Sequence, residues 1–210
     1  MKLSPIILAI LVTLSILFGL SVAAYAVKVD LSFPDKTVHL SGKVITGSNQ
    51  SYSAVGNAVV TITYKSLDMK PGTIRLDSMN AEKIQVDMTT NVNKKQVPKK
   101  AVASGGVVIH GRRLAPQVGS VNGVIQEIKA TGQTATMIQA ENTVTLDGNV
   151  VIKTTEVGEE VASAEGSKAV MSLKENNEAG GWFTIEGEPG GQAEITSTTK
   201  EKPKSAPLPK

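Results

Sequence analysis

The sequence predicts an elongated all-β protein made of stacked strands, and three observations support this fold class. The stretch Thr143–Ile152 places apolar side chains at alternate positions, which is typical of a strand with one buried face. Similar glycine-containing strands recur along the chain. Beyond the N-terminal apolar segment, no stretch carries a helical period of useful length. Stacking is expected because a repeat unit of about 40 residues cannot bury a face alone.

The repeat is built around a glycine and the apolar run next to it. The glycines are Gly56, Gly105, Gly148 and Gly187, so the spacings are 49, 43 and 39 residues. At Gly148 the strand must bend, bulge or turn, because glycine tolerates the backbone angles that such a feature needs. A second strand precedes the glycine strand and reads Ala-x-Gly-x-x-Ala-x-Met at residues 130–137 and 164–171.

The N-terminal segment, residues 1–26, is predicted to be a signal peptide. Residues 6–20 are densely apolar, and Ala24-Tyr25-Ala26 supplies the small residues that a signal peptidase accepts before Val27. The apolar run is also close to the ~20 residues that span a bilayer. An uncleaved membrane anchor is therefore the alternative, and in both cases the rest of the chain lies outside the cytoplasm.

Residues 29–195 are predicted to form one β domain. The chain has no cysteine, so disulfides do not stabilise it. With three Phe, three Tyr and one Trp, its core must consist mainly of aliphatic side chains. Residues 196–210, with three prolines and four lysines, are predicted to be a disordered tail.

Between these limits the alternation is clear in some stretches and interrupted in others. Residues 29–66 read as the first unit, and residues 74–88 continue its pattern. The polar stretch 91–100 contains Pro98, which cannot donate to a strand ladder, and therefore indicates a long connection or an edge. Residues 110–128 are ambiguous because Pro116 breaks the pattern.

The sequence offers little to an enzyme, a metal site or a cofactor. His39 and His110 are the only histidines, they belong to different repeats, and cysteine is absent. Zinc or copper sites of the usual His/Cys kind are therefore not expected. No nucleophile elbow, P-loop or dinucleotide fingerprint occurs, so we expect a protein without catalytic activity and without a cofactor.

The main electrostatic feature is a group of basic residues in a chain of formal net charge +3. One interpretation is a solvated face, and the other is attraction to an anionic surface such as phosphorylated lipid headgroups. Nucleic acid is a poor partner, because no aromatic residues are interleaved for base stacking. The candidate headgroup residues are Lys94, Lys95, Lys99, Lys100, Arg112 and Arg113.

With the repeat written out, the chain resembles the OstA-like family of β-jellyroll proteins, which includes the periplasmic lipopolysaccharide-transport proteins LptA and LptC. The resemblance rests on Leu146-Asp-Gly-Asn-Val-Val-Ile152, on the Ala-x-Gly-x-x-Ala strands at 130–135 and 164–169, and on Tyr52-Ser-Ala-Val-Gly-Asn57. It covers most of residues 38–195. The insertion at 94–120 and the long apolar N-terminus depart from the pattern of LptA and of LptC.

The resemblance implies an open, V-shaped β-jellyroll of antiparallel strands with an apolar groove between two sheets. Lipid acyl chains lie in such a groove, and domains of this family join edge to edge. An open jellyroll also leaves edge strands free for a neighbouring domain. Other jellyroll domains of a lipid-transport bridge, or further copies of this chain, are thus the expected protein partners.

We therefore expect a periplasmic lipid-binding bridge or chaperone module that moves lipopolysaccharide or a related glycolipid toward the outer membrane. The alternative is a structural or adhesive cell-surface β-solenoid that binds no lipid. A tightly filled interior would favour the solenoid, and an open apolar cleft would favour transport. The candidate lipid-groove residues are Ala58, Val60, Ile62, Val107, Ile109, Val144, Leu146, Val150, Ile152, Phe183 and Ile185.

Overall fold

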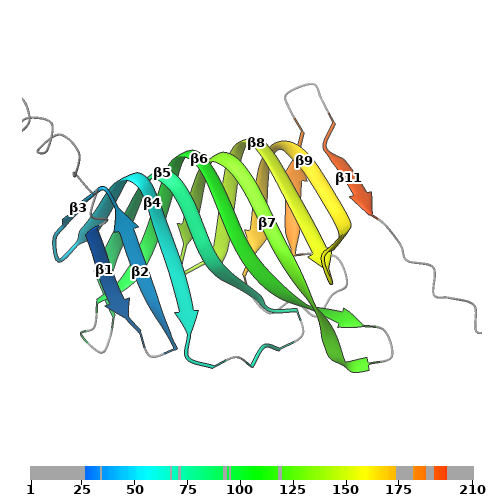
Figure 1. The fold of residues 1–210 in the computed structure, drawn as a ribbon, viewed down its shortest axis with the longest axis horizontal. Coiled ribbons are helices and arrows are strands. Elements are labelled where there is room, and N and C mark those ends of the chain that lie inside the picture. The colour runs from blue at the N-terminus through cyan, green and yellow to red at the C-terminus, as the bar shows by residue number, and fades with distance from the viewer. Residues whose placement is uncertain are drawn as a thin grey trace, which may run out of the picture.

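The fold, seen in a computed structural model, is all-β, as the sequence predicts (Figure 1). The structure describes residues 27–33, 35–66, 68–70, 72–91, 94, 96–117, 120–173, 182–187 and 192–197. Its strands are β1 (Val27–Ser32), β2 (Lys36–Gly42), β3 (Val44–Gly47), β4 (Ser51–Tyr64), β5 (Ile74–Thr90), β6 (Gln96–Gln117), β7 (Ser120–Ile138), β8 (Thr143–Glu156), β9 (Glu159–Ser172), β10 (Phe183–Glu186) and β11 (Glu194–Ser197).

All the strands belong to one open antiparallel sheet. Its main path is β1-β2-β4-β5-β6-β7-β8-β9-β10, while β3 pairs with β4 and β11 pairs with β9. Neighbours in the sheet are neighbours in the sequence almost throughout, so hairpin connections join consecutive long strands. The path does not close into a barrel, which leaves strand edges at both ends of the sheet.

The long strands bend along a line of β-bulges that crosses the sheet. On β4, β6 and β8, two consecutive residues have positive φ: Gly56 and Asn57, Gly105 and Gly106, and Gly148 and Asn149. Glycine and asparagine are the residues that adopt this conformation most readily. The strand register shifts at the same positions. The bend predicted at Gly148 is thereby confirmed, and three of the four repeat glycines mark one continuous crease.

The crease folds the sheet into two limbs that face each other (Figure 1). In the figure the strands turn over at the upper edge, and both limbs run downward from it. The β2 limb contains β1, β2, β11 and residues 58–64, 74–81, 107–117, 120–132, 150–156 and 159–166. The β3 limb contains β3, β10 and residues 51–55, 83–90, 96–104, 134–138, 143–147 and 168–172.

The core lies between the limbs and is aliphatic. Alternate residues of each strand point inward, and the largest fully buried side chains include Leu40, Ile84 and Ile109. On β8 the predicted parity is confirmed, because Val144, Leu146, Val150 and Ile152 are at most 1% exposed whereas Asp147 and Asn149 are exposed. Narrow strands with small and branched side chains let the limbs approach closely. The members of the core are Phe33, Val38, Leu40, Ala54, Ala58, Val60, Ile74, Leu76, Met79, Ala81, Ile84, Val86, Met88, Ala103, Val107, Ile109, Ile128, Ala130, Ala135, Val144, Leu146, Val150, Ile152, Ala169, Met171 and Trp182.

The interpretation of residues 91–100 as a long connection is wrong, whereas the edge alternative holds in part, because residues 96–98 pair with β5 only. β5 ends at Thr90 and β6 begins at Gln96, so a short turn connects two central strands. Pro98 pairs with Met88 next to a register shift, where the regular ladder is already interrupted. A proline that lacks an N–H donor is tolerated at such an irregularity.

In the ambiguous stretch 110–128, residues 110–117 and 120–128 are also strand. β6 continues through Pro116, and β7 returns from Ser120. The register of β5 begins opposite Arg113, so Pro116 lies past this partner and needs no donor there. Figure 1 shows this hairpin running past the neighbouring strand ends.

At the C-terminus, β11 extends to Ser197, two residues into the segment predicted to be disordered. Residues 198–210 and the predicted signal segment 1–26 lie outside the described residues. The described part of the chain contains no helix that is long and apolar enough to cross a membrane.

Candidate ligand cleft between the two limbs

Opposite the crease, the free ends of the two limbs enclose a cavity of about 450 Å³ that is open to solvent. We call this space the mouth. Both limbs contribute to its wall, so its width depends on how far the limbs are apart. It is lined by Asp35, Lys36, Ile62, Tyr64, Lys65, Ser66, Thr73, Ile74, Arg75 and Leu76 from the β2-limb side and by Met137, Gln139, Asn142 and Leu173 from the β3-limb side.

A second cavity lies deeper between the limbs and is almost entirely apolar. Its volume is about 60 Å³, which corresponds to about two water molecules. Lys36, Ile62, Leu76, Met137 and Gln139 border both this inner cavity and the mouth, so the two spaces adjoin. The remaining wall of the inner cavity consists of Val38, Val60, Ser78, Met79, Ile84, Val86, Pro98 and Ala101.

The residues predicted to line a lipid groove all face the interior, but few of them reach these cavities. Val60 and Ile62 line the inner cavity. Phe183 and Ile185 are partly buried and pack against the core. The other members, namely Ala58, Val107, Ile109, Val144, Leu146, Val150 and Ile152, are at most 1% exposed and pack in the core itself.

Sequence reasoning missed Leu76 and Met137, which border both cavities. Neither residue lies in the apolar run beside a repeat glycine, which is the pattern that predicts the groove residues. Alternation alone carried a usable signal for Leu76, because it shares its parity with Ile74 on the same strand.

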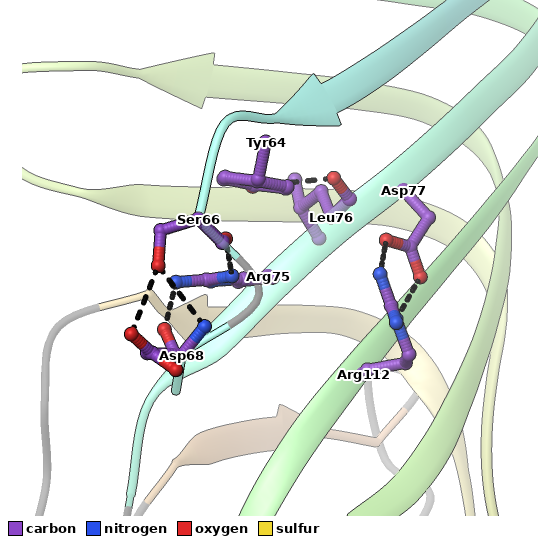
Figure 2. A network of polar contacts seen from close by, with 7 residues as sticks. All are labelled: Tyr64, Ser66, Asp68, Arg75, Leu76, Asp77 and Arg112. Carbon is purple, nitrogen blue, oxygen red and sulfur yellow. Dashed lines mark hydrogen bonds and ion pairs between the residues drawn. The ribbon is translucent and has the colours of Figure 1, made fainter. Parts of the chain in front are cut away.

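One side of the mouth is held by a polar network (Figure 2). The Tyr64 hydroxyl donates a hydrogen bond of 3.2 Å to the Leu76 carbonyl oxygen, and burial raises the pKa of this phenol. The Arg75 guanidinium lies 4.7 Å from the centre of the Tyr64 ring. It also donates to the carbonyl oxygens of Ser66, at 2.7 Å, and Asp68. These bonds fix the chain after β4 against β5, so this rim is ordered before a ligand arrives.

The predicted basic cluster is divided by the fold. Arg112 points to the outer face, where its Nε and Nη2 donate to the two oxygens of Asp77 at 2.8 and 2.7 Å (Figure 2). This bidentate pair raises the pKa of Arg112 and neutralises its charge. Lys99 and Lys100 are exposed on the β3 limb, and Lys94 is exposed before β6. Lys95 lies outside the described residues.

Arg113, the next residue on β6, points the other way into the interior and is only 7% exposed. Its guanidinium carbon lies 5.6 Å from the centre of the Trp182 ring, which belongs to the opposite limb. Burial lowers the pKa of Arg113. Within the part of the chain that the structure describes, we find no carboxylate paired with it, and its Nε has no hydrogen-bond partner.

The two histidines remain apart. His39 lies on β2, where its Nδ1 is 2.7 Å from an Asp30 carboxylate oxygen on β1, and His110 is exposed on β6. The described residues contain no group of three or more His, Asp or Glu side chains that could hold a metal ion.

Comparison with solved structures finds proteins of similar fold. The chain is similar to LptH, the LptA-homologous periplasmic component of the conserved lipopolysaccharide transport device from Pseudomonas aeruginosa. The TM-score is 0.47 and the identity is 14%, over 77% of this chain and 95% of LptH. No family model and no curated protein sequence matches the chain.

Both ends of the sheet expose apolar side chains. Val27 on β1 and Val44 on β3 are 45% and 57% exposed at the N-terminal end. At the C-terminal end, Ile195 on β11 is 63% exposed. Among the described strands, β1, β3, β10 and β11 each pair on one side only. Such edges are templates for pairing with another strand.

Proposed function

We propose that the protein is a periplasmic lipid carrier or bridge module that holds the acyl chains of lipopolysaccharide, or of a related glycolipid, between its two limbs. The observation that carries this proposal is the apolar inner cavity next to an open mouth, with walls from both limbs. The sequence resemblance to the OstA-like family agrees with it. The proposed role is binding and transfer, without chemical conversion of the lipid.

The limbs have to part for a chain to enter, because the inner cavity holds only about two water molecules. The facing walls are apolar side chains, so separation exposes apolar surface that the ligand then covers again. Each methylene removed from water contributes about 0.8 kcal/mol, and a chain of ~14 carbons therefore supplies roughly 10 kcal/mol before ordering costs. This energy offsets part of the cost of separating the limbs.

Edge pairing would extend the cleft from one domain to the next. The N-terminal edge, formed by β1 and β3, and the C-terminal edge, formed by β10 and β11, are both available for antiparallel or parallel addition. When unlike edges join, the same contact repeats head to tail from one domain to the next. This produces a row of domains rather than a closed dimer. The proposed partners are therefore other jellyroll domains or further copies of this chain.

A photo-crosslinking residue placed at Ile62 tests the cleft, with Thr61 as the matched control. Ile62 borders both cavities, whereas Thr61 is exposed on the outer face of the same strand. After addition of lipopolysaccharide and irradiation, we expect lipid adducts at Ile62 and none at Thr61. Absence of adducts at both Ile62 and Met137, in variants with an intact β-sheet circular dichroism spectrum, would contradict lipid binding.

A structural β-solenoid is the second candidate, and the filled interior favours it. Most of the predicted groove residues are at most 1% exposed, as in an ordinary core. A solenoid that only stiffens a surface assembly needs no parting of its limbs. The crosslinking experiment separates the two functions, since a solenoid gives no adduct at Ile62.

A further inference from the structure

Arg113 is a buried cation in a wall that is otherwise apolar. Its neighbours of the same parity on β6 are Val107, Ile109, Gly111 and Ala115, all of them buried. Removing a guanidinium from water is costly unless hydrogen bonds and an opposite charge compensate for it. A folded chain that keeps arginine here, rather than a leucine or methionine, therefore retains an energetic disadvantage in its ligand-free form.

The contact with Trp182 does not remove this disadvantage. A cation over an indole ring at 5.6 Å gains a modest attraction, which is smaller than the desolvation of a full charge. The contact also leaves the Nε–H of the guanidinium without an acceptor. The ring holds the arginine in place while the Nε donor stays available.

The position of Arg113 connects it to the mouth. The strand register places it directly opposite Ile74, which lines the mouth on the β2 limb. On the β3 limb, the Trp182 carbonyl oxygen accepts a hydrogen bond from Ser172, the residue before Leu173, and Leu173 also lines the mouth. Arg113 and Trp182 thus lie beside residues of the mouth wall, and their contact joins the two limbs.

We propose that Arg113 binds the oxyanion of an acidic amphiphile, a phosphate or carboxylate attached to the acyl chain, inside the cleft. The inference rests on the proposed function and specifies its ligand class. The guanidinium fork donates two parallel hydrogen bonds to such a group, and the bond is stronger in a site of low dielectric than at an exposed lysine. The ligand anion supplies the charge partner that the described part of the chain does not provide.

Arg112 gives a matched control. It is adjacent on the same strand and carries the same side chain, but it points outward and is already paired with Asp77. Three variants are therefore compared with the wild type: Arg113→Met, Arg113→Lys and Arg112→Met. Methionine at position 113 has about the length of the arginine stem and suits an apolar wall, and lysine keeps the charge without the fork.

The first measurement is the melting temperature with inorganic phosphate against sodium chloride at equal ionic strength. We expect phosphate to raise the melting temperature of the wild type and of Arg112→Met, and to leave Arg113→Met unchanged. Equal stabilisation of all variants would overturn the inference, because the anion would then bind elsewhere.

The second measurement compares decyl phosphate with decanol, two ligands of equal chain length. We expect the wild type and Arg112→Met to bind decyl phosphate about tenfold more tightly or better, as for a charged hydrogen bond. Arg113→Met should bind both ligands equally, and Arg113→Lys should show an intermediate preference. Equal binding of both ligands by the wild type would overturn the inference while leaving acyl-chain binding intact. Binding of neither ligand, with the phosphate effect retained, would contradict the lipid function and assign Arg113 to free phosphate.

Discussion

Leu146 and Thr145 are adjacent on β8 and differ in the face on which they lie. Leu146 is fully buried, whereas Thr145 lies on the outer face and is partly exposed. Truncation of a buried leucine to alanine removes its transfer free energy and leaves a cavity, which costs about 2–5 kcal/mol. We expect Leu146→Ala to lower the free energy of unfolding by about this amount and Thr145→Ala by about 0.5 kcal/mol. Urea denaturation measures both, and equal losses would show that the faces are assigned wrongly.

Asp30 and His39 form a hydrogen-bonded pair at the first edge of the sheet. The bond from His39 lowers the pKa of Asp30, so the folded state favours the ionised carboxylate. A lowered pKa contributes stability above the ordinary pKa of the carboxyl group, and this contribution is lost as the pH falls through the lowered value. We expect His39→Phe to raise the pKa of Asp30 toward its ordinary value, as followed by carboxyl NMR titration. His110→Phe, at the other histidine, should leave the Asp30 titration unchanged.

At the residue scale, alternation predicted which side chains face inward but not what a charged one does there. Counting by twos from Val107 and Ile109 places Arg113 inward and Arg112 outward. The basic cluster nevertheless predicts that both arginines contact one anionic partner surface, because charged side chains are rarely buried. Parity is the stronger signal in a strand whose backbone is fixed by neighbours on both sides.

Gly105 and Gly106 allow two requirements of the crease to be separated, namely a positive φ and the absence of a Cβ. Both have positive φ, at 86° and 76°. A Cβ at position 105 would lie 2.6 Å from the Cβ of Glu82, whereas a Cβ at position 106 meets nothing within 4 Å. We expect Gly106→Ala to cost about 1 kcal/mol for its backbone conformation alone. Gly105→Ala should cost about 1–3 kcal/mol more because of the added overlap.

Thermal or urea denaturation of both alanine variants measures this difference. Glu82→Ala should not rescue Gly105→Ala, because the atom in contact is the Cβ that alanine retains. Equal destabilisation at positions 105 and 106 would mean that the strand adjusts to relieve the overlap.

At the element scale, the glycine repeat predicted the bends of β4, β6 and β8 because positive φ has a strong sequence preference. The strands between them bend without such a mark. On β5 and β7 the crease passes near Glu82 and Gln133, which the bulge glycines face. Glu82 and Gln133 have ordinary negative φ, so their residue types do not indicate a bend. Pro98 misled for the opposite reason, since its local signal is strong but a register shift accommodates it.

At the scale of the whole molecule, the facing of the two limbs determines where the cleft lies. Period-two patterns assign residues to the interior but do not say which strands lie opposite each other across it. Ile62 on β4 and Met137 on β7 meet at the same cavities although they belong to different repeats. This pairing depends on the twist of the bent sheet, a property of all strands together. The sequence thus predicts the fold class better than the position of the cleft.

The two ends of the sheet predict head-to-tail association that depends on unlike edges. Val44→Lys places a charge on the N-terminal edge, and Ile195→Lys places one on the C-terminal edge, in both cases replacing an exposed apolar side chain. Edge charges oppose strand addition. We expect the wild type to form oligomers that grow with concentration in sedimentation velocity, and each variant alone to remain smaller than the wild type at equal concentration.

A mixture of the two variants provides the decisive measurement. Each retains one intact edge, and these edges are unlike, so an equimolar mixture should form dimers and stop there. A pairing of like edges about a two-fold axis would instead let the variant that retains this edge dimerise alone. Dimers in either separate sample would therefore contradict head-to-tail joining. Dimers found only in the mixture would assign the contact to the N-terminal edge of one copy and the C-terminal edge of the next.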